Sequence, residues 1–428
     1  MSDLSLAARV HDVSAGPARL LLLPTPVRDV VSFRGSFQTA LDLSSEDDVV
    51  QSLAAVLLDK GTTTRDRFQI AEVLEDRGAR LSFYSDGLRL VVSGRALRAD
   101  LPEVLALAGE ILRQPAFEAE QVEKARTRAI AGVRRAREET SAQAAGALAR
   151  RLYGLAHPNY VLEPDEEIAR IERITPDSVR AFHAAHVGPR DFVMALAGDL
   201  DPDATQAAVA DAFGGWTAAP VEAVYDAEAA PQPAGTEAIG MSDRLNLDVR
   251  IGHALDIRRS HDDYLALYAA VFALGGNFSS RLMQTVRDEQ GLTYGTSASI
   301  ADVSVEHDGH LSVAITLSQD NLERGIAATR EQVARVLDEG IGEDELDRVR
   351  TTLAGRHVVG LATTGGLAVR LLINAERGFD VDYLDRYPDL VHALTPEAVT
   401  SALRRHVRLD DLHTVVAGTL PETVPAGG

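Results

Sequence analysis

The chain has 428 residues, 45% of them hydrophobic, and a formal net charge of −21 at pH 7. This length indicates more than one domain. The complete lack of cysteine excludes disulfides, thiol catalysis and cysteine-ligated metals. The acidic balance and the lack of a basic run argue against binding to nucleic acid or to an anionic membrane surface. No signal peptide precedes the first elements, and no stretch approaches the roughly eighteen apolar residues of a membrane span, so we expect a cytoplasmic protein.

The first half mixes strands and helices in an order typical of an α+β fold. Strands are predicted within residues 7–38 and at 79–85, 87–95 and 192–197. Helices are predicted at 46–60, 65–76, 99–113, 118–138, 141–154, 164–170, 176–187 and 202–213.

The second half repeats the first. The segment Ile174–Val179 reappears as Leu394–Val399, and Phe192–Leu200 reappears as Leu412–Leu420, both at an offset of 220 residues. Because there are only two copies, the repeat indicates two homologous α+β domains rather than a solenoid. We therefore expect a first domain at 1–215 and a second at 239–428. Residues 216–238 are rich in Ala, Pro and Glu and are predicted to be a linker.

Several segments carry a family resemblance. The sequence Leu57-Leu58-Asp59-Lys60-Gly61-Thr62 ends one predicted helix and precedes another, and His157-Pro158 lies between later helices. Together with the duplication and the paired Ala-Gly-(Asp/Thr)-Leu strand ends, these segments resemble the M16 metallopeptidases (the insulinase, pitrilysin and mitochondrial processing peptidase family). The resemblance implies that each domain is an antiparallel-rich mixed sheet with helices packed on one face. It also implies that the two domains form half of a clamshell.

The zinc site of that family has no counterpart in these residues. M16 enzymes carry an inverted H-x-x-E-H motif, in which two histidines on one helix face bind zinc and the glutamate activates water. By resemblance, these positions fall on Ser52, Ala55 and Val56, and the third zinc ligand falls on Gly132. None of these residues is a normal zinc ligand or a general base. We therefore expect no cofactor in this chain and zinc in a partner subunit.

Two other histidine clusters were considered as metal sites. His183 and His186 lie three residues apart on a predicted helix, and Glu306-His307-Asp308-Gly309-His310 reads as a turn between strands. Histidines that are hydrogen-bonded or solvated are the more common explanation for such clusters. The chain also lacks a G-x-S-x-G elbow, a P-loop and a dinucleotide-binding glycine fingerprint.

The segment from Leu274 to Tyr294 most closely follows the family pattern. Here Ser279 or Ser280 is positioned to cap a helix that Gly291 ends. Arg287 and Tyr294 are similar to an arginine and a tyrosine of the non-zinc half of M16 enzymes. The resemblance implies that they bind the substrate backbone and stabilise its developing negative oxygen, a role that suits their donor groups. The alternative is that Arg287 forms an ion pair with Asp288 or Glu289 while Tyr294 packs in the sheet.

These observations lead to one main functional hypothesis. The chain is expected to be a non-catalytic, substrate-binding subunit that supplies Arg287 and Tyr294 to a zinc peptidase, with zinc on a homologous H-x-x-E-H partner. A peptide or unfolded polypeptide would bind as an added strand at a sheet edge, and a homodimer is the alternative assembly if the partner is absent. The alternative is a structural or peptide-binding protein with no peptidase role, and an active hydrolase with unrecognised residues ranks last.

Overall fold

The computed structural model describes residues 5–217 and 221–420. The described chain divides into two compact units, and neither is continuous in sequence. Unit 1 contains the chain up to Ala131 together with Glu167–Tyr225 and Arg356–Tyr387. Unit 2 contains Gly132–Glu166, Asp226–Gly355 and the chain from Pro388 onward.

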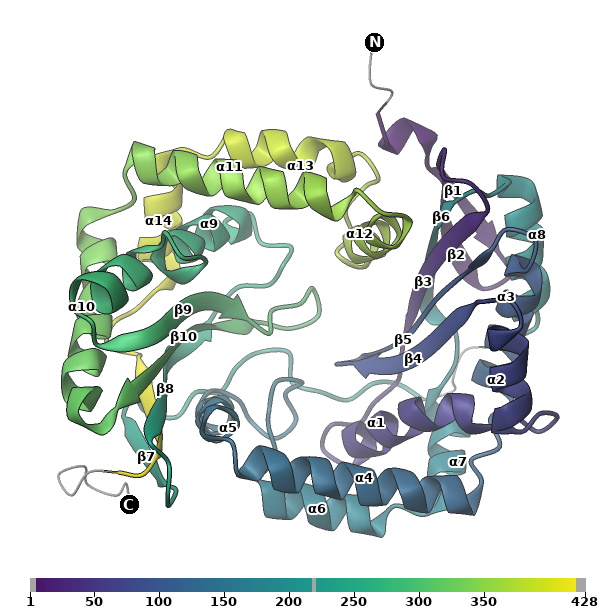
Figure 1. Cartoon of the computed structure of the whole chain (residues 1–428), viewed down its shortest axis with the longest axis horizontal. Coiled ribbons are helices and arrows are strands. Elements are labelled where there is room, and N and C mark those ends of the chain that lie inside the picture. The colour runs from purple at the N-terminus through teal and green to yellow at the C-terminus, as the bar shows by residue number, and fades with distance from the viewer. Residues whose placement is uncertain (1–4, 218–220, 421–428) are drawn as a thin grey trace. The chain divides into compact units, whose positions relative to one another are not determined.

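Unit 1 is built on a six-stranded sheet with the order β1-β2-β6-β3-β5-β4 (Figure 1). Its strands are β1 (His11–Ala15), β2 (Ala18–Pro24), β3 (Val30–Gln38), β4 (Arg80–Asp86), β5 (Arg89–Leu97) and β6 (Arg190–Gly198). The β2–β6 pair is parallel and the other pairs are antiparallel. The edge strand β4 is therefore bonded to β5 on one side only.

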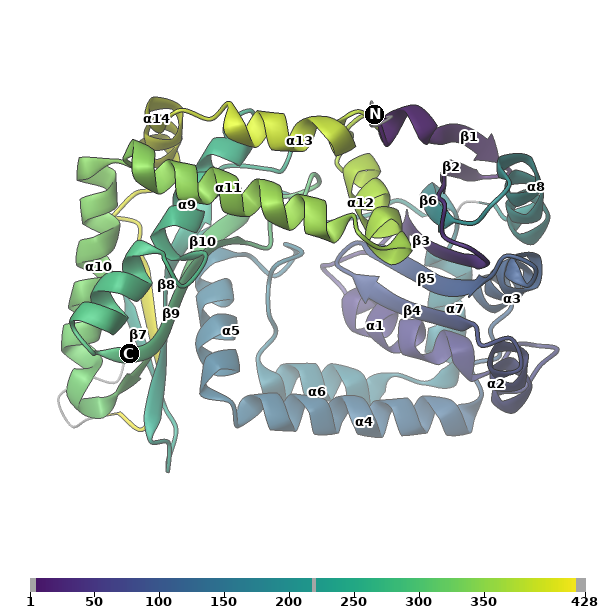
Figure 2. The same ribbon diagram turned by 45° about the horizontal axis from the view of Figure 1, so that its top comes forward.

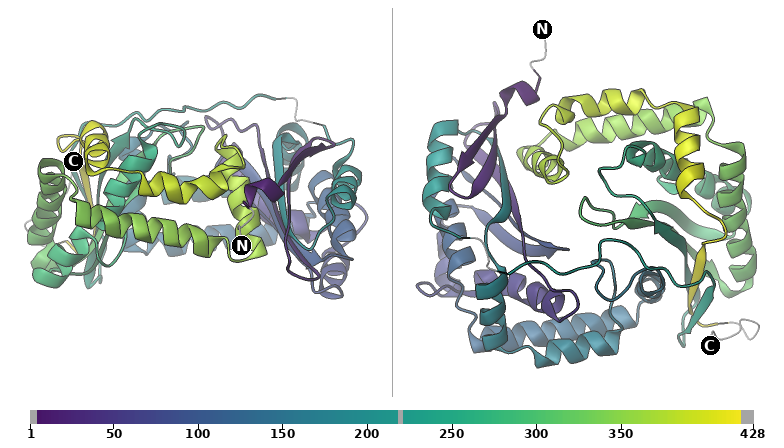
Figure 3. Two further views of the ribbon diagram at one scale, coloured as in Figure 1. Left: turned by 90° about the horizontal axis from the view of Figure 1, so that it is seen from above. Right: turned by 180° about the vertical axis from the view of Figure 1, so that it is seen from behind.

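Successive side chains of a strand point to opposite faces of a sheet, and both faces of this sheet carry apolar side chains. On β2, Leu20 and Leu22 join the main core, whereas Leu21 and Leu23 face a second cluster. Helices of the first half contribute to the main core, and α12 covers the second face (Figures 2 and 3). The helices that lie wholly in unit 1 are α1 (Asp47–Leu57), α2 (Arg67–Glu75), α3 (Leu101–Arg113), α7 (Pro176–His186), α8 (Pro202–Phe213) and α12 (Thr364–Glu376). Residues of both units make up α4 (Ala119–Arg137), α6 (Pro164–Arg173), α11 (Glu343–Gly360) and α13 (Tyr383–His392).

Helix α12 is held in unit 1 by apolar side chains that pack against the sheet. Leu367, Leu371 and Leu372 are almost fully buried against β2 and β6. Burying a leucine side chain contributes roughly 1.5–3 kcal/mol. These three residues therefore stabilise α12, which as a short isolated helix would be only marginally stable. A hydrogen bond from the Ser36 hydroxyl to the Glu376 carboxylate adds a polar contact between β3 and α12.

Unit 2 repeats this design with a five-stranded sheet of order β7-β11-β8-β10-β9. Its strands are β7 (Thr236–Gly240), β8 (Asn246–Leu255), β9 (Thr293–Ala301), β10 (Gly309–Ser318) and β11 (His413–Gly418). Helix α5 (Thr140–Leu152) packs its Leu148 against Val415 and Ala417 of β11 (Figure 1). The remaining major helices are α9 (Tyr264–Gly275), α10 (Leu322–Glu339) and α14 (Pro396–His406).

The predicted duplication is visible in the strand order. Strands β2, β6, β3, β5 and β4 have the same neighbours as β7, β11, β8, β10 and β9, and each sheet contains one parallel pair. The repeated Thr-Pro pairs also act alike. The Thr175 hydroxyl accepts from the Ser178 N–H at 3.1 Å, and the Thr395 hydroxyl accepts from the Ala398 N–H at 3.2 Å, so both cap the helices that follow.

The predicted α+β fold with two mixed, antiparallel-rich sheets is confirmed, with one addition. The compact units exchange segments relative to the halves 1–215 and 239–428, because 132–166 packs in unit 2 and 356–387 packs in unit 1. Each exchanged segment brings a helix, α5 or α12, to a sheet face that would otherwise expose apolar side chains. Positions 218–220 of the predicted linker lie outside the described residues.

No single described helix is long and apolar enough to cross a membrane. Only α11 and α12 together reach such a composition, and they are bent by 115° at the break between them.

Candidate functional site

The face of α1 that corresponds to the zinc motif carries almost no groups that can bind a metal. Ser52, Ala55 and Val56 follow the i, i+3, i+4 spacing of one helix face. Ser52 is exposed, Val56 is 51% exposed and Ala55 is buried. Gly132 lies on α4, where an added Cβ would meet no atom within 4 Å. These four positions offer one hydroxyl and neither nitrogen nor carboxylate ligands, so they do not fit a zinc ion.

Arg287 lies on a π-helix, η3 (Met283–Glu289), a form that is rare and often found at functional sites. Its Nε donates to the backbone oxygen of Tyr294 at 3.0 Å, and its Nη1 donates to Asp288 Oδ1 at 2.9 Å. The guanidinium also lies 5.7 Å from the centre of the Phe278 ring, within the range of a cation–π contact. The ion pair that was considered as an alternative is therefore present, but it leaves one nitrogen, Nη2, without a bond to the described residues.

The expected serine cap of this helix is not formed. Leu282 precedes the helix without a side-chain cap, the Ser279 hydroxyl donates to Asn277, and the Ser280 hydroxyl is buried without a hydrogen-bond partner among the described residues. A π-helix has different orphan N–H groups from an α-helix, which explains why the usual capping position does not apply. Gly291, with a φ of +62°, ends the helix as predicted.

Tyr294 is presented to solvent by a β-bulge. Thr293 pairs with Leu317 and Thr296 pairs with Ile315, so Tyr294 and Gly295 together face only Thr316. The Thr293 hydroxyl fixes the bulge by donating to the Thr316 oxygen at 2.6 Å. Bulges of this kind reorient a side chain, and the Tyr294 side chain is 91% exposed. The alternative that Tyr294 packs in the sheet is therefore wrong.

Phe278, Arg287 and Tyr294 together form what we call the β9 site. Phe278 is 78% exposed beside the guanidinium, and β9 is the last strand of its sheet, paired only with β10 among the described strands. An edge strand has unpaired backbone groups that can bind an extended chain. Gly275 supports this edge, because its Cα approaches β9 so closely that a Cβ would lie 2.2 Å from the Ala298 nitrogen. The site thus combines a backbone template, a cation and a phenol.

The His183–His186 pair is not a shared metal site. His183 Nε2 bonds the Leu112 oxygen at 2.9 Å, whereas His186 Nδ1 bonds the Ala40 oxygen at 2.6 Å. Burial lowers the pKa of His183, which fits a neutral ring. The two rings therefore serve different backbone carbonyls.

The histidines of the β9–β10 loop belong to a buried network in unit 2. His157 Nε2 lies 3.1 Å from Asp308 Oδ1, and the His157 ring stacks on Tyr153 with centroids 4.3 Å apart. The Tyr153 hydroxyl contacts His310 Nδ1 at 3.0 Å. Burial lowers the pKa values of His307 and His310. This network attaches the His157-Pro158 segment to the loop, so its role is structural.

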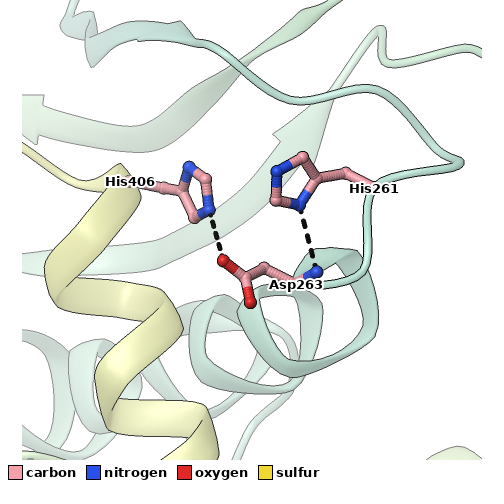
Figure 4. Close-up of side chains that lie close together, drawn as sticks. All are labelled: His261, Asp263 and His406. Carbon is pink, nitrogen blue, oxygen red and sulfur yellow. Dashed lines mark hydrogen bonds and ion pairs between the residues drawn. The ribbon is translucent and has the colours of Figure 1, made fainter.

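A third cluster, which the sequence analysis missed, joins the start of α9 to the end of α14 (Figure 4). His261, Asp263 and His406 have possible ligand atoms within 4.8 Å of one another. However, His261 Nδ1 already accepts from the Asp263 N–H at 3.0 Å, and Asp263 Oδ2 accepts from His406 Nε2 at 2.9 Å and from Arg405. Burial raises the pKa of Asp263, but these bonds outweigh it and leave that pKa below its usual range. A metal would have to displace these bonds, so the cluster reads as a helix-end contact.

Comparisons with known proteins agree with this architecture. Residues 53–164 match the model of the insulinase family (peptidase family M16), and residues 173–353 match the model of the peptidase M16 inactive domain. An uncharacterized zinc protease of Mycobacterium tuberculosis is 28% identical over 323 residues, which cover 74% of this chain and 71% of that protein. A non-peptidase homolog from Helicobacter pylori, YmxG, is 21% identical over 88% of this chain and 86% of its own length.

A solved structure gives the same result at the level of the fold. The peptidase M16 inactive domain from Pseudomonas fluorescens is 24% identical and superposes with a TM-score of 0.86, covering 98% of this chain and all of that one. Between them, the two family models cover more than half of the chain. The chain therefore belongs to the M16 (insulinase) peptidase family.

Proposed function

We propose that this protein is a non-catalytic, substrate-binding subunit of a zinc peptidase, whose zinc is held by a homologous H-x-x-E-H partner. The observation that carries the proposal is the 91% exposed Tyr294 on a bulged edge strand beside Arg287. A tyrosine exposed to this degree does not contribute to the core. Its exposure at a position set up by a bulge and a π-helix supports a role in binding.

An extended peptide is the substrate class that fits this edge. Backbone N–H and C=O groups of β9 would pair with the backbone of an added strand, which gives affinity with little dependence on sequence. The alternating burial along β9 leaves every second side chain exposed beside the added strand. Such an arrangement suits peptides or unfolded polypeptides rather than one folded protein.

The two donor groups define what the site would contribute to the reaction. The Tyr294 hydroxyl and the Arg287 guanidinium can donate hydrogen bonds to a peptide carbonyl that gains negative charge during hydrolysis. The partner's zinc would supply the activated water, because the corresponding positions in this chain, Ser52, Ala55 and Val56, cannot. This division predicts that the isolated chain binds no stoichiometric zinc and cleaves no peptide.

A structural or peptide-binding role without any peptidase partner is the second candidate. The Arg287 contact with Asp288 at 2.9 Å favours it, since it partly neutralises the cation. The relation to a protein described as a non-peptidase homolog supports it as well. The composition of the native complex separates the two candidates.

The first experiment is therefore to isolate the protein from its native lysate and identify what accompanies it in near-equal amount. Recovery of an M16 homologue with H-x-x-E-H, together with zinc, supports the subunit role. Recovery of the chain with itself alone transfers the support to the second candidate.

The second experiment measures turnover by the assembled pair with Y294F or R287Q. Loss of a transition-state donor lowers kcat by roughly a hundredfold or more, with assembly unchanged. The matched control is R335Q, because Arg335 is an exposed arginine of the same unit that pairs only with Glu339. Full activity in both site variants would rule out the proposed contribution of the β9 site.

A further inference from the structure

A pocket of about 410 Å³ lies within unit 1, apart from the β9 site. Its apolar lining comes from six residues on α2, β4 and α3, namely Phe68, Ile70, Ala71, Leu74, Leu81 and Ile111. Its volume falls within the range of about 300–1,000 Å³ that is typical of small-ligand sites. The pocket therefore has the size and the apolar wall that a small amphipathic molecule needs.

Gln121 gives this pocket an unusual polar wall. Its side chain lines the pocket, and its amide is open to the pocket and makes no hydrogen bond to any described residue. An amide both donates and accepts, so its natural complement is another amide group.

The charges around the pocket favour an anion. Lys60 is paired with Asp59 at 2.8 Å, and Arg67 stacks over Phe68 with its guanidinium carbon 4.4 Å from the ring centre. Arg128 also lines the pocket and makes no ion pair with a described residue.

The remaining acid is Glu75, which is exposed at the end of α2. With Lys60 and Asp59 compensating each other, two arginines face one carboxylate, and the lining carries a net positive charge. A carboxylate is the ligand group that an arginine binds best, through two parallel hydrogen bonds.

We propose that this pocket binds a small amphipathic carboxylate that also carries an amide. Its apolar body lies on Ile70, Leu74 and Ile111, its amide bonds Gln121, and its carboxylate bonds Arg128. The C-terminal end of a short apolar peptide and an N-acyl amino acid share this chemistry. The site needs neither a partner subunit nor the β9 site, so it stands independently of the proposed function.

Isothermal titration calorimetry on the full chain tests the assignment with three probes: acetyl-Leu-Leu, N-octanoylglycine and octanoate. The first two contain an amide and a carboxylate, and octanoate lacks the amide. We expect saturable binding of at least one amide-containing probe, more tightly than octanoate. The tighter of the two identifies the source as peptide or N-acyl amino acid. The C-terminal amide of acetyl-Leu-Leu, which lacks the carboxylate, is expected to bind at least about tenfold more weakly than the free acid.

Two variants locate the binding site. R128Q should weaken binding of the carboxylate probes by about tenfold or more, while R135Q, an exposed arginine on the same helix, should leave it unchanged. Q121L should selectively weaken binding of the amide-containing probes, because it removes the group that bonds their amide. Octanoate binding equal to that of the amide probes overturns the amide assignment. Absence of saturation with all probes, or equal losses in R128Q and R135Q, overturns the site.

Discussion

The edges of the two sheets carry different chemistry. In unit 1, α1, which packs beside the edge strand β4, presents Ser52 and Val56 where the resemblance to M16 enzymes implies catalytic ligands. In unit 2, the edge strand β9 presents Tyr294 through a bulge and Arg287 through a π-helix. Apart from β1 of unit 1, the strands follow the same order in both units. The shared backbone therefore fixes how the strands and helices pack, whereas the side chains at the two sheet edges differ in chemistry.

The strongest test of the shared backbone is a matched pair of glycine substitutions. Gly198 and Gly418 occupy the ends of β6 and β11 with φ values of 148° and 147°. An alanine at either site is strained, by about 1–3 kcal/mol. A Cβ on Gly198 would also lie 2.2 Å from the Val30 oxygen, whereas on Gly418 its nearest neighbour, the Asn246 oxygen, is 3.0 Å away. We expect G198A to lower the free energy of unfolding by roughly 3 kcal/mol or more and G418A by less.

Urea unfolding measures the two losses, and hydrogen exchange assigns them to a unit. Loss of amide protection should concentrate in β3 and β6 for G198A and in β8 and β11 for G418A. Gly355, where an added Cβ would meet no atom within 4 Å and φ is not positive, provides the control substitution G355A. Equal destabilisation by G198A and G418A would contradict the idea that the close approach to Val30 adds to the backbone strain.

The two units should differ in their sensitivity to acid. Burial lowers the pKa values of four unit 2 histidines from the ordinary 6.5, namely His253, His307, His310 and His413. At a pH near 6.5 and below, these histidines bind fewer protons in the folded unit than in the unfolded chain. Its stabilisation is therefore present above pH 6.5 and is lost as the pH falls through and below that value.

Unit 1 contains buried carboxyl groups whose effect on stability has the opposite dependence on pH. Burial raises the pKa values of three carboxyls, Asp48, Glu167 and Glu376, above their ordinary 3.8 or 4.5. The folded unit binds more protons than the unfolded chain, so these groups stabilise it below their ordinary pKa values, and this stabilisation is lost as the pH rises through their folded values. Two unit 1 histidines, His183 and His357, act in the other direction. We therefore expect unit 2 to lose protection first as the pH falls from 7 toward 5.

Hydrogen exchange between pH 7 and pH 5, corrected for the intrinsic exchange rate, provides the measurement. His310→Gln should flatten the pH dependence of unit 2, although it also removes the contact with Tyr153 and lowers stability at pH 7. His392→Gln changes an exposed histidine and should have no such effect. Earlier loss of protection in unit 1 would contradict the assignment of acid sensitivity to the buried histidines.

Much of this architecture could be read from the sequence, but the parts that depend on distant contacts could not. The Thr175-Pro176 and Thr395-Pro396 pairs predict helix starts because capping is a local interaction. The exchange of α5 and α12 leaves no such trace, since an apolar helix face has the same pattern whichever sheet it covers. The bulge at Tyr294 depends on the Thr293 hydroxyl reaching Thr316 across the sheet. The segment and its two functional candidates were predictable, whereas the geometry that exposes Tyr294 was not.

The smallest expected effect comes from the two helix caps. Removing a threonine cap costs about 1 kcal/mol, so T175A and T395A should shift the unfolding of their respective units by similar amounts. Thr175 also belongs to a full capping box, because the Ser178 hydroxyl accepts from the Thr175 N–H at 2.9 Å, and Thr395 has no such partner, since the equivalent residue is Ala398. T175A keeps this bond, because its donor is the backbone N–H, so the two threonine losses should be similar, and A398S should add the missing bond to unit 2. Urea unfolding of T175A, T395A and A398S checks these expectations. A larger loss for T395A than for T175A would mean that the packing of α14, rather than its cap, sets the difference between the two units.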